Sequence, residues 1–243
     1  MILRKFSKKI NYLIRSFRYK VFIIYLQLFQ NNIFDIKKIS KLDNSLTFLM
    51  NKHFSDKGDI NFTHNYTRFY HSLFSNIQDK KLNIFEVGLG SVDPKVTFHM
   101  SYSNKNYSPL ASLKAWRDYF KNSKIFGADI DTKILKNSER IETFFVDMQD
   151  KQSIESMWNK INSKMDIIID DGFHSYEANI NFFENSINFL KTDGFYIIED
   201  VHRKPSNIIK FFKYFKKNKI KFQIIDLKHS VNILDNCLIL IKK

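Results

Sequence analysis

Acidic residues recur in this chain at the points where short apolar runs end. The runs have the length and composition of buried strands, and one or two carboxylates close each of the first five. In an open parallel sheet the carboxyl ends of the strands share one edge, where ligands bind. The pattern predicts an acidic rim, whose repulsion must be offset by positive charge or hydrogen-bond donors. Its members would be Glu86, Asp129, Asp147, Asp170, Asp171, Glu199 and Asp200.

A glycine turn follows the first predicted strand. The strand Leu82–Glu86 leads into Gly88-Leu89-Gly90. Because glycine lacks Cβ and tolerates positive φ, the backbone of such a turn can approach a ligand closely, although G-x-G alone is as well explained by a tight turn. Asp129 lies about one strand-helix-strand unit further on, where an acid can bind ribose hydroxyls. No G-x-x-x-x-G-K-[ST] loop is present, which disfavours ATP or GTP binding.

The elements that would position these residues alternate along the chain. Predicted strands cover residues 82–86, 124–130, 140–146, 166–169, 195–198, 222–225 and 237–241. Predicted helices cover residues 66–74, 113–120, 176–190, 153–161 and 205–217, and Thr63, Ser112 and Ser175 are the predicted N-caps of the first three of these. This alternation predicts an α/β fold with a doubly wound, mostly parallel, seven-stranded Rossmann-like sheet.

Two segments beside the predicted rim have open roles. His64, Tyr66 and Tyr70 could reach a neighbouring pocket, although such residues pack in a core by default. Val92–Ala111 is a long polar segment without periodicity, and loops of this length are usually functional lids or disordered. Its position directly after the glycine turn favours a lid.

The amino-acid composition limits which binding partners and which cellular compartment we expect for this protein. A chain of 243 residues with 44% apolar residues can form one α/β domain with an extension. The net charge of +14 fits a polyanionic partner or an anionic membrane, but the abundance of Lys, Asn, Ile and Phe is also typical of an AT-rich genome. A single cysteine, Cys237, excludes an internal disulfide and fits a reducing compartment, so we expect a cytoplasmic protein.

Residues 1–55 are predicted to form a basic helical extension of a domain at residues 56–243. Seven basic residues precede the first acid, Asp35, with apolar residues at helical spacing among them. Val21–Phe29 is far shorter than the about 20 residues of a membrane span, and no signal-peptide cleavage site follows. Residues 1–30 would pack on their own domain or on a second subunit of a homodimer, or lie on anionic lipid. We favour packing, because apolar helical faces usually belong to a core.

Six segments resemble class I S-adenosylmethionine-dependent methyltransferases. They read FEVGLGS (85–91), ASLKAWRDYF (111–120), IFGADID (125–131), RIETFFVDMQD (140–150), IIIDDGFHSYEAN (167–179) and GFYIIEDVH (194–202). More narrowly, residues 56–243 resemble the metal-dependent sugar O-methyltransferases related to the mycinamicin and macrocin enzymes, and bacterial capsule-biosynthesis methyltransferases. IDDGxH followed by a helix and G-x-Y-x-IED is fairly specific, whereas many folds share the glycine motif.

The resemblance implies which residues bind S-adenosylmethionine. Glu86, Gly88 and Gly90 would line its methionine part, Asp129 its ribose and Asp147 its adenine. The further residues expected at the cofactor are Ser91, Ile130, Met148 and Asp170. The chain departs from the usual family pattern at Leu110, Met148 and Phe173, which bears on the lid and the acceptor pocket more than on the methyl donor.

The resemblance also implies a metal and a base. Asp171, Glu199 and Asp200 look like the family's metal ligands, and carboxylate oxygens suit Mg²⁺, which would hold two vicinal sugar oxygens and lower the pKa of one. Asp200 could instead hydrogen-bond nearby backbone. His174 matches the general base, because imidazole titrates near neutral pH, and it forms the predicted catalytic pair with Asp171. The alternative role of His174 is to cap the helix that follows it.

The predicted function is methyl transfer from S-adenosylmethionine to a carbohydrate or nucleotide-sugar hydroxyl in surface polysaccharide (capsule) biosynthesis. A phosphoramidate or a natural-product glycoside is the alternative acceptor, and His202 and Arg203 would meet an anionic one. We expect no nucleic-acid substrate, because the Asn/Asp-Pro-Pro-aromatic motif of amino-methylating enzymes is missing. A non-catalytic membrane-associated scaffold is the remaining alternative. The sequence identifies neither the acceptor nor the oligomeric state.

Overall fold

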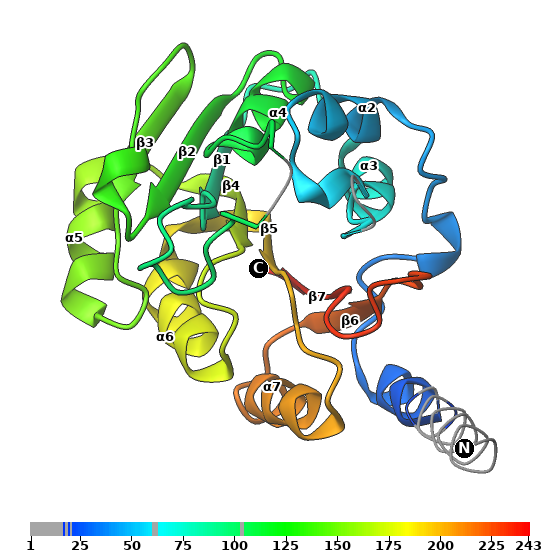
Figure 1. Ribbon diagram of the computed structural model, residues 1–243. Helices are drawn as coiled ribbons and strands as arrows, with labels where there is room; N and C mark the ends of the chain where they lie inside the picture. The colour runs from blue at the N-terminus through cyan, green and yellow to red at the C-terminus, as the bar shows by residue number, and fades with distance from the viewer. Residues whose placement is uncertain (1–16, 18, 20, 60–62, 103–104) are drawn as a thin grey trace, which may run out of the picture.

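The computed structural model describes residues 17, 19, 21–59, 63–102 and 105–243, and a seven-stranded sheet lies at its centre (Figure 1). The strand order is β3-β2-β1-β4-β5-β7-β6. All neighbours pair in parallel except β7, which runs antiparallel to β5 and β6. The predicted doubly wound, mostly parallel α/β sheet is therefore confirmed. The strands are β1 (Asn83–Val87), β2 (Lys124–Asp129), β3 (Ile141–Phe145), β4 (Met165–Asp170), β5 (Leu190–Ile198), β6 (Phe222–Asp226) and β7 (Cys237–Lys242).

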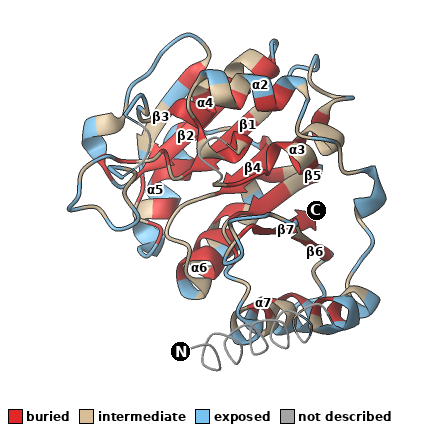
Figure 2. Cartoon of the chain, turned by 45° about the vertical axis from the view of Figure 1, so that its right-hand side comes forward, coloured by how far each residue is buried: buried red, intermediate tan, exposed pale blue. Residues whose placement is uncertain are grey.

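Helices cover both faces of the sheet. On one face are α2 (Ser45–Lys52), α3 (Thr67–Phe74) and α4 (Ala111–Tyr119), and on the other are α5 (Lys151–Ile161), α6 (Tyr176–Ser186) and α7 (Pro205–Lys217). Because strand side chains alternate, Ile167 and Ile169 of β4 join the first core and Ile168 joins the second. Figure 2 shows the buried residues concentrated on the strands and on the helix faces turned toward them. The 3-10 segments are η1 (Ile36–Lys38), η2 (Asp56–Gly58), η4 (Thr132–Ile134) and η5 (Ile187–Phe189).

Helix starts depend on local hydrogen bonds, and two differ from the sequence prediction. Ser175 caps α6 as expected, accepting from the Ala178 N–H at 3.2 Å. Thr63 does not cap α3, since that helix begins at Thr67 and the Thr63 hydroxyl donates to the Asp56 carbonyl at 2.8 Å. Ser112 lies inside α4, because Leu110 precedes the helix in a left-handed conformation, and the Ser112 side chain is free to face the sheet.

The described part of the N-terminal extension packs on its own domain. Residues 21–29 are helical, and Ile23 and Leu26 are buried in the core that contains β6 and α7. The other side of this helix exposes apolar side chains, so the predicted homodimer or lipid contact stays a prediction. Most of the basic stretch lies outside the described residues. Among the described ranges, no helix is long and apolar enough to cross a membrane.

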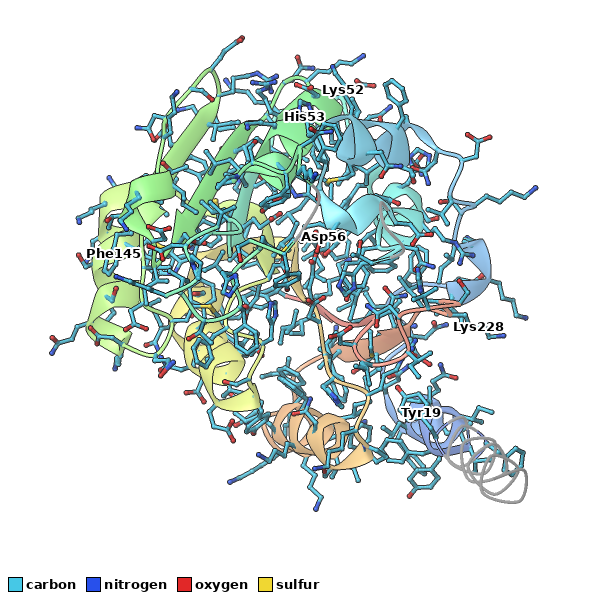
Figure 3. All side chains as sticks on the ribbon, in the orientation of Figure 1. Tyr19, Lys52, His53, Asp56, Phe145 and Lys228 are labelled. Atoms are coloured by element: carbon cyan, nitrogen blue, oxygen red, sulfur yellow. The ribbon has the colours of Figure 1, made fainter. Side chains whose placement is uncertain are left out.

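Helix α2 is continuous with the sheet domain. Leu46 and Met50 of α2 share one core with Trp116 of α4. His53, which follows α2, places Nε2 2.7 Å from Asp118 Oδ2 of α4 (Figure 3). Residues before position 56, the predicted start of the domain, thus pack directly on that domain.

Candidate active site

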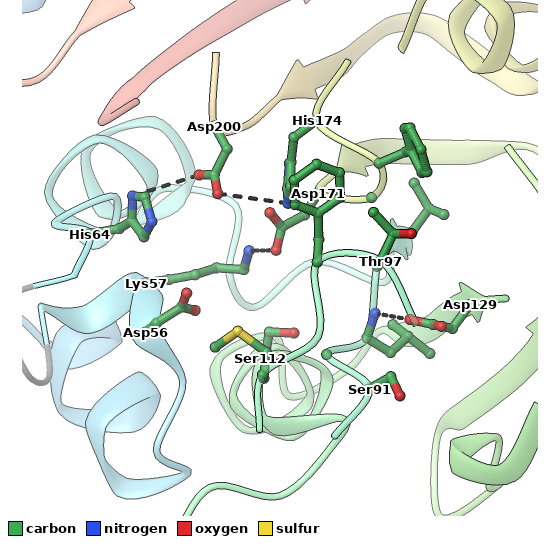
Figure 4. Close-up of a pocket in the computed structure, with 18 of the residues that line it drawn as sticks. Asp56, Lys57, His64, Ser91, Thr97, Ser112, Asp129, Asp171, His174 and Asp200 are labelled. Carbon is green, nitrogen blue, oxygen red and sulfur yellow. Dashed lines mark hydrogen bonds and ion pairs between the residues drawn. The ribbon is translucent and has the colours of Figure 1, made fainter. Parts of the chain in front are cut away.

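A cavity of about 730 Å³ opens at the carboxyl ends of β1, β2, β4 and β5 (Figure 4). Its walls come from the turn after β1, the ends of the neighbouring strands, the segment after the glycine turn, the η2 region and the loop between β6 and β7. The predicted site residues that line it are Gly88, Gly90, Ser91, Asp129, Ile130, Asp147, Met148, Asp171, His174 and Asp200. The structure thus brings most of the predicted residues to one cavity.

Asp129 holds the glycine turn in place. Gly88 and Gly90 have φ of 90° and 73°, and a Cβ at Gly88 would collide with the Asp171 carbonyl oxygen. Asp129 accepts from the Leu89 N–H at 2.7 Å, and its other oxygen accepts a second backbone N–H at 2.9 Å. Burial raises the pKa of Asp129, and these backbone donors act against that rise. Each oxygen keeps a lone pair, so the carboxylate can also accept a hydrogen bond from a ligand hydroxyl.

Residues beyond Asp129 form an apolar wall with polar edges. Ile130 and Met148 both line the cavity, Ile130 half exposed and Met148 buried. Asp147 accepts from the Gln149 N–H at 2.9 Å. This wall can hold a flat, partly polar ring system.

Two predicted cofactor residues lie behind the cavity wall. β1 continues to Val87, so Glu86 faces α4 and accepts from the Ser112 hydroxyl and from Trp116 Nε1, the latter at 2.5 Å. Asp170 is fully buried and accepts from the Tyr196 hydroxyl at 3.2 Å, and burial raises the pKa of Asp170 to about 6. Neither residue is among those that line the cavity, and their role at a cofactor stays a prediction.

Asp171, His174 and Asp200 converge at the cavity. One ligand-type atom from each lies within 4.8 Å of the others, and His174 Nε2 is 3.8 Å from Asp200 Oδ2 (Figure 4). His174 and Asp200 have φ of 51° and 52°, a left-handed conformation that costs a residue with a side chain on the order of 1 kcal/mol or more. Strain of this kind clusters at functional sites.

Asp200 is surrounded by hydrogen-bond donors. Its Oδ1 accepts from the Tyr66 hydroxyl at 2.6 Å and lies 3.6 Å from His64 Nδ1. Burial raises the pKa of Asp200, but the two histidines and Tyr66 lower it by more, so that the net shift is downward. The open roles of His64 and Tyr66 are thereby resolved in part, because both contact this acid.

Glu199 faces away from Asp200 and His174. Its carboxylate accepts from Lys57 Nζ and from the Tyr70 hydroxyl, and Glu199 is 1% exposed. The structure therefore groups His174, and not Glu199, with Asp171 and Asp200. Glu199 directly follows the end of β5, and the left-handed backbone at Asp200 turns the Asp200 side chain in another direction.

Lys57 is the site residue that sequence reasoning missed. Asp56-Lys57-Gly58 has the pattern of a polar turn, yet Lys57 is 2% exposed and its Nζ lies 2.5 Å from Asp171 Oδ2. Burial lowers the pKa of Lys57, but the surrounding carboxylates raise it by more, so the ammonium stays protonated. The one feature of the sequence that pointed to such a lysine was the acidic rim. The rim requires a positive charge nearby, and the strand ends that form it do not contain one.

The segment after the glycine turn covers the cavity. Within residues 92–102 and 105–110 there is no helix or strand. The Phe98 ring packs against the His174 ring at 5.2 Å between centroids, and the Tyr107 hydroxyl donates to the Gly90 carbonyl at 3.2 Å. The segment thus lies where the sequence predicts a lid. Its lining residues are Val96, Thr97, Phe98, Met100, Tyr102 and Tyr107.

Of the two residues expected to meet an anionic acceptor, only one faces the cavity. His202 lines it, but Arg203 does not. Arg203 Nε donates to Asp226 Oδ1 at 2.7 Å, and its guanidinium also binds carbonyls of the loop between β6 and β7. The prediction for Arg203 is wrong, because its donors are already used within the fold.

Curated relatives of this chain carry the names of sugar O-methyltransferases. No protein-family model matches. The 8-demethyl-8-alpha-L-rhamnosyl tetracenomycin-C 2'-O-methyltransferase of Streptomyces olivaceus is 30% identical over 153 residues, which are 62% of this chain and 36% of that protein. The mycinamicin VI 2''-O-methyltransferase of Micromonospora griseorubida is 26% identical over 156 residues, 64% of this chain and 36% of that protein. The chain spans about a third of the length of these curated relatives.

Solved structures share the fold. The methyltransferase MycE of the mycinamycin pathway, in complex with Mg, SAH and mycinamycin VI, has a TM-score of 0.59 at 20% identity, covering 82% of this chain and 54% of that chain. An O-methyltransferase from Bacillus cereus in complex with SAH has a TM-score of 0.51 at 14% identity, covering 83% and 91%. The resemblance stated from the sequence is thereby confirmed: the chain has the class I methyltransferase fold and is similar in sequence to sugar O-methyltransferases.

Proposed function

We propose that this protein is an S-adenosylmethionine-dependent O-methyltransferase that methylates a sugar hydroxyl. The observation that carries the proposal is a single cavity with the glycine turn and Asp129 on one side and Asp171, His174 and Asp200 on the other. A volume of about 730 Å³ is in the range of small-molecule sites. The names of the similar relatives support the same reaction.

The cofactor would lie along the ends of β1, β2 and β3. Asp129 would accept from the ribose hydroxyls, and the adenine would lie between Ile130 and Met148 with Asp147 at its edge. The methionine part would follow the turn Gly88–Gly90, where glycine lets the backbone approach. A sulfonium is positively charged, and the carboxylates around this cavity favour it electrostatically.

His174 would act as the general base. A sugar hydroxyl loses its proton as it accepts the methyl group, so a base must lie within hydrogen-bond reach of it. His174 Nδ1 is enclosed without a hydrogen-bond partner among the described residues, whereas Nε2 faces Asp200. Nε2 is therefore the nitrogen that would take the proton, and the Asp200 carboxylate would stabilise the resulting imidazolium.

A divalent cation would assist this reaction. Asp171 and Asp200 offer carboxylate oxygens close to His174, the donor type that Mg²⁺ prefers, so the residues fit such an ion. When bound, Mg²⁺ would orient two vicinal hydroxyls and lower the pKa of one of them. Asp171 and Asp200 would hold the ion, and His174 would remain free to accept the proton.

The acceptor that we propose is a sugar of a bacterial surface polysaccharide, such as a capsule precursor. This finer assignment is supported only by the resemblance to capsule-biosynthesis methyltransferases. The similar curated relatives act, by their names, on sugars of natural products, so a glycosylated small molecule is the second candidate. Phe98, Tyr102 and Asn232 line the cavity and would provide rings and an amide for either kind of sugar.

Cofactor binding tests the core of the proposal. We expect S-adenosylhomocysteine to bind in isothermal titration calorimetry, and Asp129→Ala to weaken binding by about tenfold or more, since charge-assisted hydrogen bonds are worth about 1.5–3 kcal/mol. Glu142→Gln, an exposed acid of β3, is the matched control and should bind like wild type. Absence of binding to the wild-type protein would refute the proposal.

An acceptor screen then separates the finer assignments. Methyl transfer from labelled S-adenosylmethionine should be measured against nucleotide sugars, polysaccharide fragments and glycosylated small molecules. Transfer to the first two supports the capsule assignment, and transfer only to the third replaces it. Tight RNA binding that falls steeply with salt would instead favour a nucleic-acid substrate.

A further inference from the structure

Lys57 occupies the space between the ends of β4 and β5. It comes from η2, which lies outside the sheet, and its Nζ contacts acids from three strand ends. The Nζ is 2.5 Å from Asp171 Oδ2, donates to Glu199 Oε2 and lies 3.8 Å from Glu86 Oε1. The side chain of Lys57 is 2% exposed, and Lys57 is among the residues that line the cavity.

This position requires a cation. Glu86 and Glu199 are almost completely buried, and a buried carboxylate without a partner costs several kcal/mol. An ammonium or a metal ion could supply the charge, but the two cannot share the space, because Nζ is within hydrogen-bond distance of both Asp171 and Glu199. The other oxygen of Glu199 accepts from the Tyr70 hydroxyl. Both carboxylate oxygens of Glu199 therefore already accept hydrogen bonds within the protein.

We propose that Lys57 is the fixed counter-cation of these strand-end acids: it fills the place between Asp171 and Glu199 that a divalent metal would otherwise take, and it restricts metal binding to the side of the cluster formed by Asp171 and Asp200. Lys57 is thus a positioning residue, which neutralises Glu199 and orients Asp171. Only the relevance to catalysis rests on the proposed methyl transfer, since the arrangement of charges is independent of it.

The first test asks whether Glu199 is a metal ligand. Binding of Mn²⁺ is measured by electron paramagnetic resonance on the whole protein, without cofactor or acceptor. Glu199→Gln keeps the shape of the side chain, so we expect wild-type Mn²⁺ affinity, whereas Asp200→Asn should weaken binding by about tenfold or more. A loss in Glu199→Gln as large as that in Asp200→Asn would overturn the proposal.

Removal of the ammonium gives the second test. Lys57→Met should bind Mn²⁺ about tenfold tighter or more than wild type, because Asp171 and Glu199 then form an uncompensated acidic pair. Adding Glu199→Gln to this variant should abolish the gain, and Lys133→Met, which removes an exposed lysine, should show none. Metal affinity in Lys57→Met no higher than in wild type, or a gain that survives Glu199→Gln, would refute the counter-cation role.

The two tests also separate this inference from the proposed function. If Lys57→Met does not fold, the Mn²⁺ affinity of Glu199→Gln still tests the inference, because that variant retains Lys57. If wild-type binding is too weak to measure, the appearance of Mn²⁺ binding in Lys57→Met supports the inference and its absence overturns it. Failure of S-adenosylhomocysteine to bind would refute methyl transfer and leave the Mn²⁺ results unaffected.

Discussion

His174 combines a strained backbone with an imidazole that has one nitrogen enclosed and the other turned to an acid. Replacing it with alanine removes the proposed base but no residue of the cofactor side of the cavity. We expect His174→Ala to lower kcat by about 100- to 10,000-fold while S-adenosylhomocysteine affinity stays at the wild-type value. Steady-state methyl transfer and calorimetry measure the two quantities.

A second histidine variant controls for this prediction. His71→Ala changes an imidazole on α3 that contacts the Tyr119 hydroxyl and does not line the cavity, so its turnover should stay near normal. Near-normal turnover of His174→Ala would remove the base assignment.

The carboxylates of Asp171 and Asp200 make metal removal a direct experiment. We expect EDTA to suppress methyl transfer and added Mg²⁺ to restore it, because two carboxylates beside the acceptor site would repel a developing alkoxide unless a cation lies between them. The measurement is initial rate before and after chelation, with Ca²⁺ as a comparison ion. Activity that is indifferent to EDTA would show that the reaction runs without a metal.

Among the elements, the turn after β1 and the lid depend on each other. Gly90 has φ of 73°, and a Cβ there would collide with the Tyr107 hydroxyl of the lid. We expect Gly90→Ala to destabilise the protein by about 1–3 kcal/mol, from strain in the left-handed region, and to weaken cofactor binding by displacing the lid. Urea unfolding and calorimetry test the two effects.

A lid substitution provides the comparison for Gly90→Ala. Ser108→Ala changes an exposed residue of the same segment, so both its stability and its cofactor affinity should match wild type. Equal effects of the two variants would mean that the turn and the lid are not coupled through Gly90.

At the scale of the whole molecule, the segment after the N-terminal helix closes one edge of the sheet. The Gln223 side chain accepts from the Ile33 and Phe34 N–H groups at 3.0 and 2.7 Å, and donates to the Phe34 carbonyl at 2.9 Å. Asn31 N–H donates to the carbonyl of Phe222 on β6 at 3.0 Å. An open outer strand invites pairing with another chain, so this cover protects the protein against association.

Gln223 is therefore expected to hold the extension in place. Gln223→Ala leaves three backbone groups without their partner, which should cost about 2 kcal/mol and speed amide exchange in residues 30–34. Urea unfolding and hydrogen exchange measure these changes, and Gln152→Ala, an exposed glutamine of α5, serves as the control. Unchanged exchange in residues 30–34 would show that the rest of the extension suffices to hold it.

Local sequence patterns determined the sheet, the glycine turn and the edge at which the acids meet. Strand length, glycine and the alternation of elements depend on residues close together in the chain, so the sequence alone places Asp129, Asp171 and Asp200 at one edge of the sheet. The tertiary structure decided which acids point into the cavity, because a shift of one residue turns a strand side chain to the opposite face of the sheet. Glu86, Asp170 and Glu199 are the residues for which this mattered.

Lys57 marks the limit of the sequence most clearly. It lies 114 residues before Asp171 and 142 before Glu199, and nothing local distinguishes it from a lysine in a solvated turn. The acidic rim determined that a positive charge must be near. Only the packing of α2 and η2 against the sheet decided which residue supplies it, because burial of a charge is a property of the folded surroundings and not of neighbours in the chain.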